Sequence, residues 1–258
     1  MRLPKTFYKI LTRLPILPRR YHCEICDKPV FAFIPLSKFY REQAKKYGFP
    51  YQPADFETID PDHFYCPRCF SFDRERLFMF YLKRHHRFNP GDKLMEFAPS
   101  PGFAGVVEKT FNVVYKTCDL FMPGVDFKLD IQDLGVLESE SYDFIICSHV
   151  LEHIPDDFRS MQNMYRILRK GGKAIMMVPV LKHTDAIDED PECTDIAERW
   201  RRFGQDDHIR LYSRKVFVER LSRAGFRVEI LNGKDYPREE LLKFGIPVEF
   251  VMYIASRT

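Results

Sequence analysis

The 258-residue chain lacks any apolar run approaching the roughly 20 residues that a membrane-spanning helix needs. It also lacks a large net charge, because 40 basic and 37 acidic side chains leave only +3, too little to argue for a nucleic-acid partner. The basic leader over residues 1–20 lacks the uninterrupted apolar core of a secretory signal. With 45% hydrophobic and 30% charged residues, the composition favours an intracellular enzyme, which we expect in the cytoplasm.

The seven cysteines are an odd number, which does not suit a disulfide framework. Four of them form two C-x-x-C pairs: Cys23, Cys26, Cys66 and Cys69. Each pair can place two thiolates on one tetrahedral Zn²⁺, and a shell of four cysteines leaves no position for water. We therefore predict a structural zinc site in a module over residues 21–72; four reduced, buried thiols are the alternative. His22 and His63 lie beside the pairs and could substitute as ligands.

The chain divides into four predicted parts: a leader over 1–20, the zinc module over 21–72, a linking helix over 73–91 and a large domain over 92–258. The leader is either a short segment packed on its own protein or a contact for membrane or RNA. Asp73 is expected to cap the linking helix. The large domain alternates strands and helices, which predicts an α/β fold with a mainly parallel sheet. Seven strands are expected, near 93–98, 113–118, 126–129, 142–147, 173–179, 226–231 and 248–256.

Two segments of the large domain carry the strongest functional signal. An apolar run ends at Cys147 and is followed by Ser148-His-Val-Leu-Glu-His-Ile-Pro-Asp156, the pattern of a buried parallel strand with polar groups at its carboxyl end. Ligands bind at that end in open α/β sheets. Further on, Leu168-Arg-Lys-Gly-Gly172 ends a predicted helix before another buried strand.

These two segments resemble motifs of the class I S-adenosylmethionine-dependent methyltransferases, in particular the methyltransferase type 11-like group. The resemblance implies a Rossmann-like sheet of seven strands, the last of them antiparallel, preceded here by the zinc module. The chain also looks like a group of bacterial methyltransferase-domain proteins with a C-P-x-C leader, an E-R-x-R helix and a late F-G-Q-E/D-D-H element. Here these are Cys66 to Cys69, Glu75-Arg76, and Phe203 to His208, with Phe70 in place of the glycine usual after the second cysteine.

The resemblance also implies a cofactor-binding first loop. On the family's first motif, Glu96 falls on the acidic position, and the three glycine positions are taken by Ala98, Ser100 and Gly102. Glycine is used there because the backbone must approach the ligand closely at a tight turn, and alanine and serine are the next smallest residues. Two prolines in this loop depart from the motif and remove N–H donors. An ordinary strand–helix turn is the alternative reading.

Further cofactor residues are expected on the following strands. Asp119 ends the second strand, where a carboxylate can accept both ribose hydroxyls; a helix cap is the alternative. Leu120 could pack on the adenine. By resemblance, Asp130 accepts the adenine amino group and Ile131 stacks on the ring. Ser148 completes the predicted S-adenosylmethionine site at the end of the fourth strand.

A hydroxyl acceptor would require a base to remove its proton. The candidates are His149, His153 and His208. Residues 181–210 form an acidic insert that we expect to be a structureless lid. His208 is favoured, because Asp206 and Asp207 precede it and it closes the lid segment; its alternative is a capping role, and that of His153 is packing.

Three functions remain open from the sequence. The first is methylation of a hydroxyl of a sugar, a glycan or another polar small molecule, since the acidic insert would repel a polyanion. The second is an RNA methyltransferase of the ribosomal type that uses the zinc module to bind RNA. The third is a non-catalytic cofactor binder, suggested by the altered first loop. The sequence does not indicate the oligomeric state.

Overall fold

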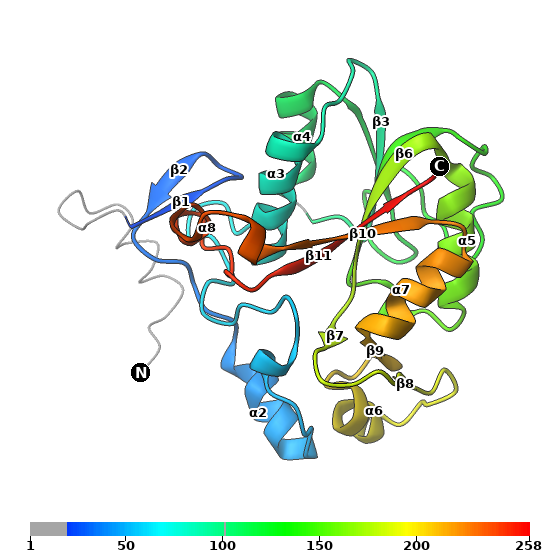
Figure 1. Ribbon diagram of the computed structural model, residues 1–258. Coiled ribbons are helices and arrows are strands. Elements are labelled where there is room, and N and C mark those ends of the chain that lie inside the picture. The colour runs from blue at the N-terminus through cyan, green and yellow to red at the C-terminus, as the bar shows by residue number, and fades with distance from the viewer. Residues whose placement is uncertain (1–19, 101) are drawn as a thin grey trace.

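A computed structural model describes residues 20–100 and 102–258, so the predicted leader up to Arg19 lies outside the described residues (Figure 1). The central sheet has the strand order β10-β11-β6-β5-β3-β4. Its strands are β3 (Lys93–Phe97), β4 (Val114–Cys118), β5 (Tyr142–Ser148), β6 (Leu168–Met177), β10 (Arg227–Asn232) and β11 (Val251–Ser256). Strands β3 to β6 pair in parallel, whereas β11 is antiparallel to both neighbours. The expected Rossmann-like fold with an antiparallel last strand is therefore confirmed.

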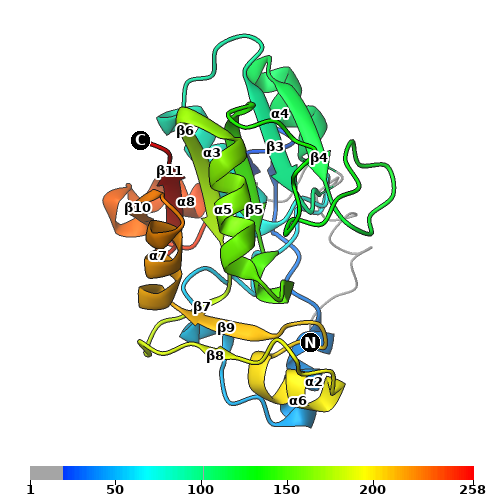
Figure 2. The ribbon, with the colours of Figure 1, turned by 90° about the vertical axis from the view of Figure 1, so that its right-hand side faces the viewer.

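Both faces of the sheet are buried, as the continuous apolar runs predict. In β5, Phe144 and Ile146 belong to one core cluster, while Ile145 and Cys147 belong to the other. Helices α3 (Asp73–His85) and α4 (Ala104–Phe111) pack into the first cluster. Helices α5 (Asp157–Ile167) and α7 (Arg214–Arg223) pack into the second, so the sheet lies between two helical layers (Figure 2).

Two local expectations are wrong. Asp73 is the first residue of α3 and not its cap; Phe72 holds the cap position, and its N–H donates to Glu75 at 3.1 Å. Residues 126–129 do not form a seventh strand in the described chain, because pairing there is limited to one parallel bridge between Cys118 and Phe127. Beside that bridge, the Asp126 side chain accepts the backbone N–H of Thr117 at 2.9 Å, so a side chain replaces the next ladder bond.

The insert over 181–210 is folded, which corrects the expectation of a structureless lid. It contains β8 (Asp188–Glu189) and α6 (Ile196–Phe203), and with β7 (Val180–Leu181) and β9 (Arg210–Ser213) it forms a three-stranded sheet. Two of its acidic residues form ion pairs within the insert, since Arg202 contacts Asp188 at 2.6 Å and Asp190 at 2.8 Å. Asp195 caps α6 by accepting the N–H of Glu198.

The N-terminal region packs against this insert. It comprises β1 (Tyr21–Cys23), β2 (Lys28–Val30), α2 (Lys38–Tyr47) and the 3₁₀ turn η1 (Pro53–Asp55). Helix α2 lies beside α6 in both views, and the Tyr47 ring stacks on Trp200 at a centroid distance of 6.1 Å (Figures 1 and 2). The remaining short elements are η2 (Leu151–His153), η3 (Gly233–Asp235) and α8 (Arg238–Lys243). No helix in the described ranges has the length and apolarity to cross a membrane.

Arg76 joins the cysteine region to the distant end of the chain. Its side chain is fully buried and lies over the Phe33 ring at 3.8 Å. The guanidinium donates to four backbone carbonyls, those of His63, Ser71, Phe244 and Gly245. This contact explains structurally why an arginine stands in the E-R-x-R helix, since five fixed donors can satisfy several buried carbonyls at once.

Candidate functional site

The four predicted metal-binding cysteines converge. The Sγ atoms of Cys23 and Cys69 are 3.7 Å apart, and those of Cys26 and Cys66 are 4.0 Å apart. A tetrahedral zinc with Zn–S bonds of about 2.3 Å separates its sulfurs by about 3.8 Å, so the donor set fits that ion. All four are free thiols in a closed cluster.

The residues beside the cysteines have other partners. His22 Nε2 contacts Asp27 at 2.7 Å, and His63 Nδ1 contacts Asp60 at 2.8 Å, so neither histidine joins the cluster. Phe70 adopts a φ of +61°, in the left-handed region that favours glycine. The glycine expected at this position by resemblance therefore has a conformational basis.

The first loop after β3 begins with a residue in a backbone conformation that favours glycine, although the sequence has alanine there. Ala98 has a φ of +49°, so it occupies the conformation for which the family's glycine is suited. The hydroxyl oxygen of Ser148 is buried and has no hydrogen-bond partner among the described residues. An unpaired buried hydroxyl at the carboxyl edge of a parallel sheet fits a polar ligand. Gly102 would accept a Cβ, whose nearest contact would be an ordinary 3.6 Å.

Asp119 and Asp130 lie in turns that follow β4. Oδ1 of Asp119 accepts the N–H groups of Phe121 and Met122, both at 2.7 Å, so this oxygen holds the turn. Leu120 is 40% exposed and Phe121 is 83% exposed, an arrangement that an adenine ring could cover. Asp130 accepts the N–H of Gln132 at 2.8 Å, while Ile131 is buried in the core.

Two buried glutamates, Glu96 and Glu75, lie near the first loop. The sequence predicted a site role for Glu96 but not for Glu75. Glu96 accepts a hydrogen bond from the Tyr115 hydroxyl, and burial raises the pKa of Glu96 to about 8. Burial also raises the pKa of Glu75, whose Oε1 has no hydrogen-bond partner in the described chain. The sequence marked Glu75 only as a motif residue and assigned it no role. In the structure its carboxyl group is buried near the first loop. A carboxyl group in this position suits the cationic end of a ligand.

Three histidines surround one buried carboxylate at the end of β5. His149 Nδ1 lies 3.3 Å from Glu152 Oε1, and His208 Nε2 lies 4.0 Å from the same oxygen. The rings of His153 and His208 meet edge to face at a centroid distance of 4.7 Å. The three histidines that the sequence offered as candidate bases lie in one cluster with Glu152 in the structure.

The members of this cluster differ in electrostatics. Burial lowers the pKa of His208 to about 4, so this ring is neutral at neutral pH. Burial would raise the pKa of Glu152, but the contact with His149 and the neighbouring histidine charges outweigh it and lower the pKa to about 2. The carboxylate therefore stays ionised, and the rings of His149 and His153 are more exposed than that of His208.

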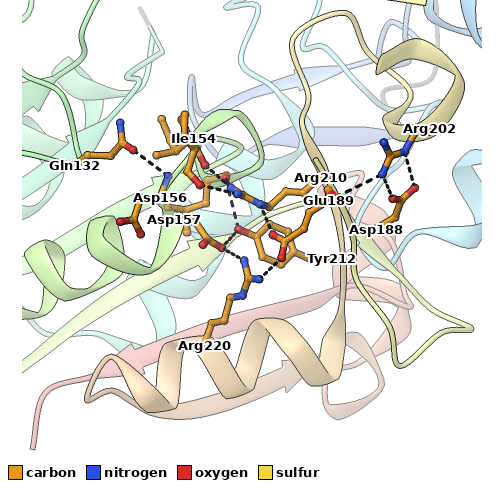
Figure 3. A network of polar contacts seen from close by, with 12 residues as sticks. Gln132, Ile154, Asp156, Asp157, Asp188, Glu189, Arg202, Arg210, Tyr212 and Arg220 are labelled. Atoms are coloured by element: carbon orange, nitrogen blue, oxygen red, sulfur yellow. Dashed lines mark hydrogen bonds and ion pairs between the residues drawn. The ribbon is translucent and has the colours of Figure 1, made fainter. Parts of the chain in front are cut away.

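A network of arginines fixes the turn that carries these residues (Figure 3). The buried Arg210 donates to the carbonyls of Leu151, Ile154 and Pro155 and pairs with Glu189 at 3.2 Å. Arg220 links Glu189 to Asp157 at the start of α5, with both contacts at 2.6 Å. Sequence reasoning missed this network, because its partners are backbone carbonyls remote along the chain.

A cavity of about 880 Å³ opens beside the histidine cluster. His149, His153 and His208 line it together with Asp73 and Arg74 of α3. Eight aromatic side chains from the N-terminal region and α6 also line it: Tyr40, Phe49, Tyr51, Phe56, Phe64, Tyr65, Phe72 and Phe203. The predicted cofactor residues are not among its lining residues. The cavity is therefore distinct from the set of predicted cofactor residues, although His149 on its wall directly follows Ser148.

Comparisons with known proteins agree with this architecture. Residues 53–230 match a family model described as "Methyltransferase domain". A stretch of 140 residues, 52% of this chain, is 31% identical to "Probable polyketide synthase 42" of Dictyostelium discoideum, and it spans only 5% of that protein.

Solved structures of similar fold include phosphoethanolamine N-methyltransferase 2 of Haemonchus contortus in complex with S-adenosyl-L-methionine. It is 15% identical, with a TM-score of 0.48, and the match covers 69% of this chain and 51% of that one. Another is a SAM-dependent methyltransferase from Archaeoglobus fulgidus, 15% identical with a TM-score of 0.45, covering 71% of this chain and 94% of that one. Because the family model spans more than half of the chain, the protein belongs to the methyltransferase domain family.

Proposed function

We propose that the protein transfers the methyl group of S-adenosylmethionine to a hydroxyl oxygen of a sugar, a glycan or another polar small molecule. The observation that carries this proposal is the set of His149, His153 and His208 on the wall of the cavity, with the buried Glu152 beside them. A hydroxyl must lose its proton as it is methylated, so a hydroxyl acceptor requires such groups. A non-catalytic binder would have no need of them.

The shape and lining of the cavity support an acceptor of this class. Flat aromatic side chains can pack on the apolar faces of a sugar ring, while a few polar groups fix its orientation. Arg74 and Asp73 supply charged groups on the α3 side, and Gln205 supplies an amide on the insert side. Such a mixed lining fits a polar molecule with apolar faces.

The cofactor would lie on the edge formed by the ends of β3, β4 and β5. Asp119 would accept the ribose hydroxyls, Asp130 and Ile131 would hold the adenine, and Ser148 with the first loop would contact the methionine part. Glu75 and Glu96 would face the positively charged end of the cofactor, which favours their ionised forms. The bound cofactor supplies an activated methyl group; the protein supplies alignment and a proton acceptor.

The base is one of the three histidines. The sequence favoured His208, but its low pKa makes it a weak base at neutral pH. His149 has a partly exposed ring whose Nδ1 points to Glu152. The carboxylate can hold that nitrogen protonated and leave Nε2 free to accept a proton, so we favour His149.

We also propose that the four cysteines hold one structural Zn²⁺. Their mutual distances support this, and the module's packing against α3 and α6 makes it part of the cavity wall. Removal of this zinc should unfold the region that carries α2.

The decisive experiment supplies methyl-labelled S-adenosylmethionine and the purified full chain to separate panels of sugars, glycans and RNA. Label in a sugar or glycan, located on oxygen by mass spectrometry, would support the proposal. Label in RNA alone would establish the nucleic-acid alternative, and binding of the cofactor without any transfer would point to a non-catalytic role.

A further inference from the structure

Glu152 is a fully buried carboxylate with histidines beside one of its oxygens. His149 Nδ1 lies 3.3 Å from Oε1, and His208 Nε2 lies 4.0 Å from the same oxygen. The other oxygen, Oε2, has no hydrogen-bond partner among the described residues. A buried ionised group left in this state costs free energy unless something else satisfies it, such as a bound cation.

The two histidines that face this carboxylate are oriented through their far nitrogens. His208 Nδ1 contacts the carbonyl of Phe203 at 3.3 Å, and His153 Nδ1 contacts the carbonyl of Asp207 at 3.2 Å. A carbonyl can only accept, so each Nδ1 carries the hydrogen and each Nε2 keeps its lone pair. This arrangement is the one that fixes metal-binding histidines in proteins.

We propose that Glu152, His153 and His208 bind a divalent transition-metal ion, with Zn²⁺ as the ion best matched to the donors. One ligand atom from each residue lies within 4.8 Å of the other two. Bonds of about 2.0–2.2 Å to each would require only small side-chain movements. Two histidines and one glutamate leave a coordination position open, unlike the closed set of four cysteines. The cavity borders this open side.

The inference rests on the proposed function and narrows the chemical class of the methyl acceptor. Zinc can expand from four to five ligands, so an ion on the cavity wall would favour an acceptor with two neighbouring oxygens, such as a sugar diol. The acceptor hydroxyl would lose its proton to Nε2 of His149. Its oxygen then forms the bond to the methyl carbon as the S–CH₃ bond breaks, and the bonding pair remains on sulfur as S-adenosylhomocysteine.

The test counts metal in the full chain equilibrated with buffered micromolar Zn²⁺, together with X-ray absorption at the zinc edge. We expect two zinc ions in the native chain, one in Glu152→Gln and one in His153→Ala. The native spectrum should contain nitrogen and oxygen scattering as well as sulfur, and the variants only sulfur. His183→Ala, which removes an exposed histidine of the insert, is the matched control and should keep both ions.

Equal zinc content in the native chain and both variants would overturn the inference. Cys66→Ser separates the two sites, because it removes a ligand of the cysteine cluster and should leave the nitrogen-and-oxygen component in place. The zinc count does not depend on activity, so a failure to methylate hydroxyls with an intact count would refute the proposed function alone. Circular dichroism verifies that each variant is folded.

Discussion

Asp119 divides its two carboxylate oxygens between the protein and the proposed cofactor. Oδ1 holds the turn through two backbone N–H groups, so only Oδ2 remains for the ribose. Asp119→Asn keeps an acceptor for the turn and loses the charge. We expect it to weaken S-adenosylmethionine binding by about 10-fold to 100-fold. This range corresponds to the loss of about 1.5–3 kcal/mol, the usual contribution of a hydrogen bond to a charged group. Calorimetry measures this, with Asp133→Asn as control; equal affinities would place the ribose elsewhere.

Glu96 should make stability depend on pH. Its folded pKa of about 8 lies above the ordinary value of 4.5, so the folded state keeps a proton that the unfolded state releases between these values. Stability should therefore fall as pH rises through this window, by up to about 1.4 kcal/mol per unit, and level off above it. Glu96→Gln removes this dependence. Urea unfolding of both proteins from pH 5 to 9, without cofactor, should show the variant gaining relative stability with pH.

The exposed Glu138 provides the control for this measurement, because Glu138→Gln should follow the native pH profile. A constant difference between the native chain and Glu96→Gln at all pH values would mean that burial does not hold the proton on Glu96. Addition of a saturating cationic cofactor should reduce the pH dependence, since a nearby positive charge favours the carboxylate.

The turn that ends in Ser71 carries a strained residue at Phe70. Its φ of +61° costs a non-glycine residue about 1–2 kcal/mol. Phe70→Gly removes both the ring and the strain, while Phe70→Ala removes the ring and keeps the strain. We therefore expect the glycine variant to be about 1 kcal/mol more stable than the alanine variant in thermal unfolding with zinc present. Equal stabilities would show that the turn relaxes without cost.

The turn over 151–155 depends on Arg210. Three of its carbonyls lose their donor in Arg210→Met, which we expect to lower the unfolding free energy by about 3 kcal/mol and to displace the histidines. Arg202→Met is the matched control, since its ion pairs are with the more exposed Asp188 and Asp190 and its loss should cost about 1 kcal/mol or less. Chemical unfolding and turnover, measured side by side, compare the two. Equal losses of unfolding free energy would show that the buried contacts of Arg210 contribute no more than the exposed ion pairs of Arg202.

The sequence predicted best those elements whose signal is local. The apolar runs before Ser148 and after Gly172 located β5 and β6, because buried parallel strands must be apolar on both faces. The expected helix end over 168–172 is wrong, because α5 ends at Ile167 and β6 begins at Leu168. The two C-x-x-C pairs located the cysteine cluster. The insert was misjudged because its acidic residues looked solvent-directed, whereas Arg202 pairs with them in the folded chain.

The site itself could be predicted only in part. Residue types marked the histidines, but nothing local indicated that His208 is buried or that Oε2 of Glu152 lacks a hydrogen bond. Those properties arise when β9 and its arginine pack on the turn after β5. Glu75 likewise acquires its raised pKa only from the burial of α3 beneath the first loop.

At the scale of the whole molecule, the cavity exists because two regions distant in sequence close over the sheet. Helix α2 and helix α6 meet through the stacked rings of Tyr47 and Trp200. Tyr47→Ala should loosen this contact and enlarge the cavity. We expect the KM for the acceptor to rise about 10-fold while the Kd for S-adenosylmethionine stays unchanged, since the cofactor edge is formed by other elements. Glu42→Ala, at an exposed position of the same helix, is the control. A loss of cofactor affinity would show instead that the regions act as one binding unit.

The buried Arg76 has a consequence for synthesis on the ribosome. Two of its four carbonyl partners, on Phe244 and Gly245, follow it by 168 and 169 residues. While the chain emerges, the guanidinium therefore has no complete set of acceptors, and desolvating it early would be unfavourable. The cysteine region would thus reach its final packing only after nearly the entire methyltransferase domain has left the exit tunnel.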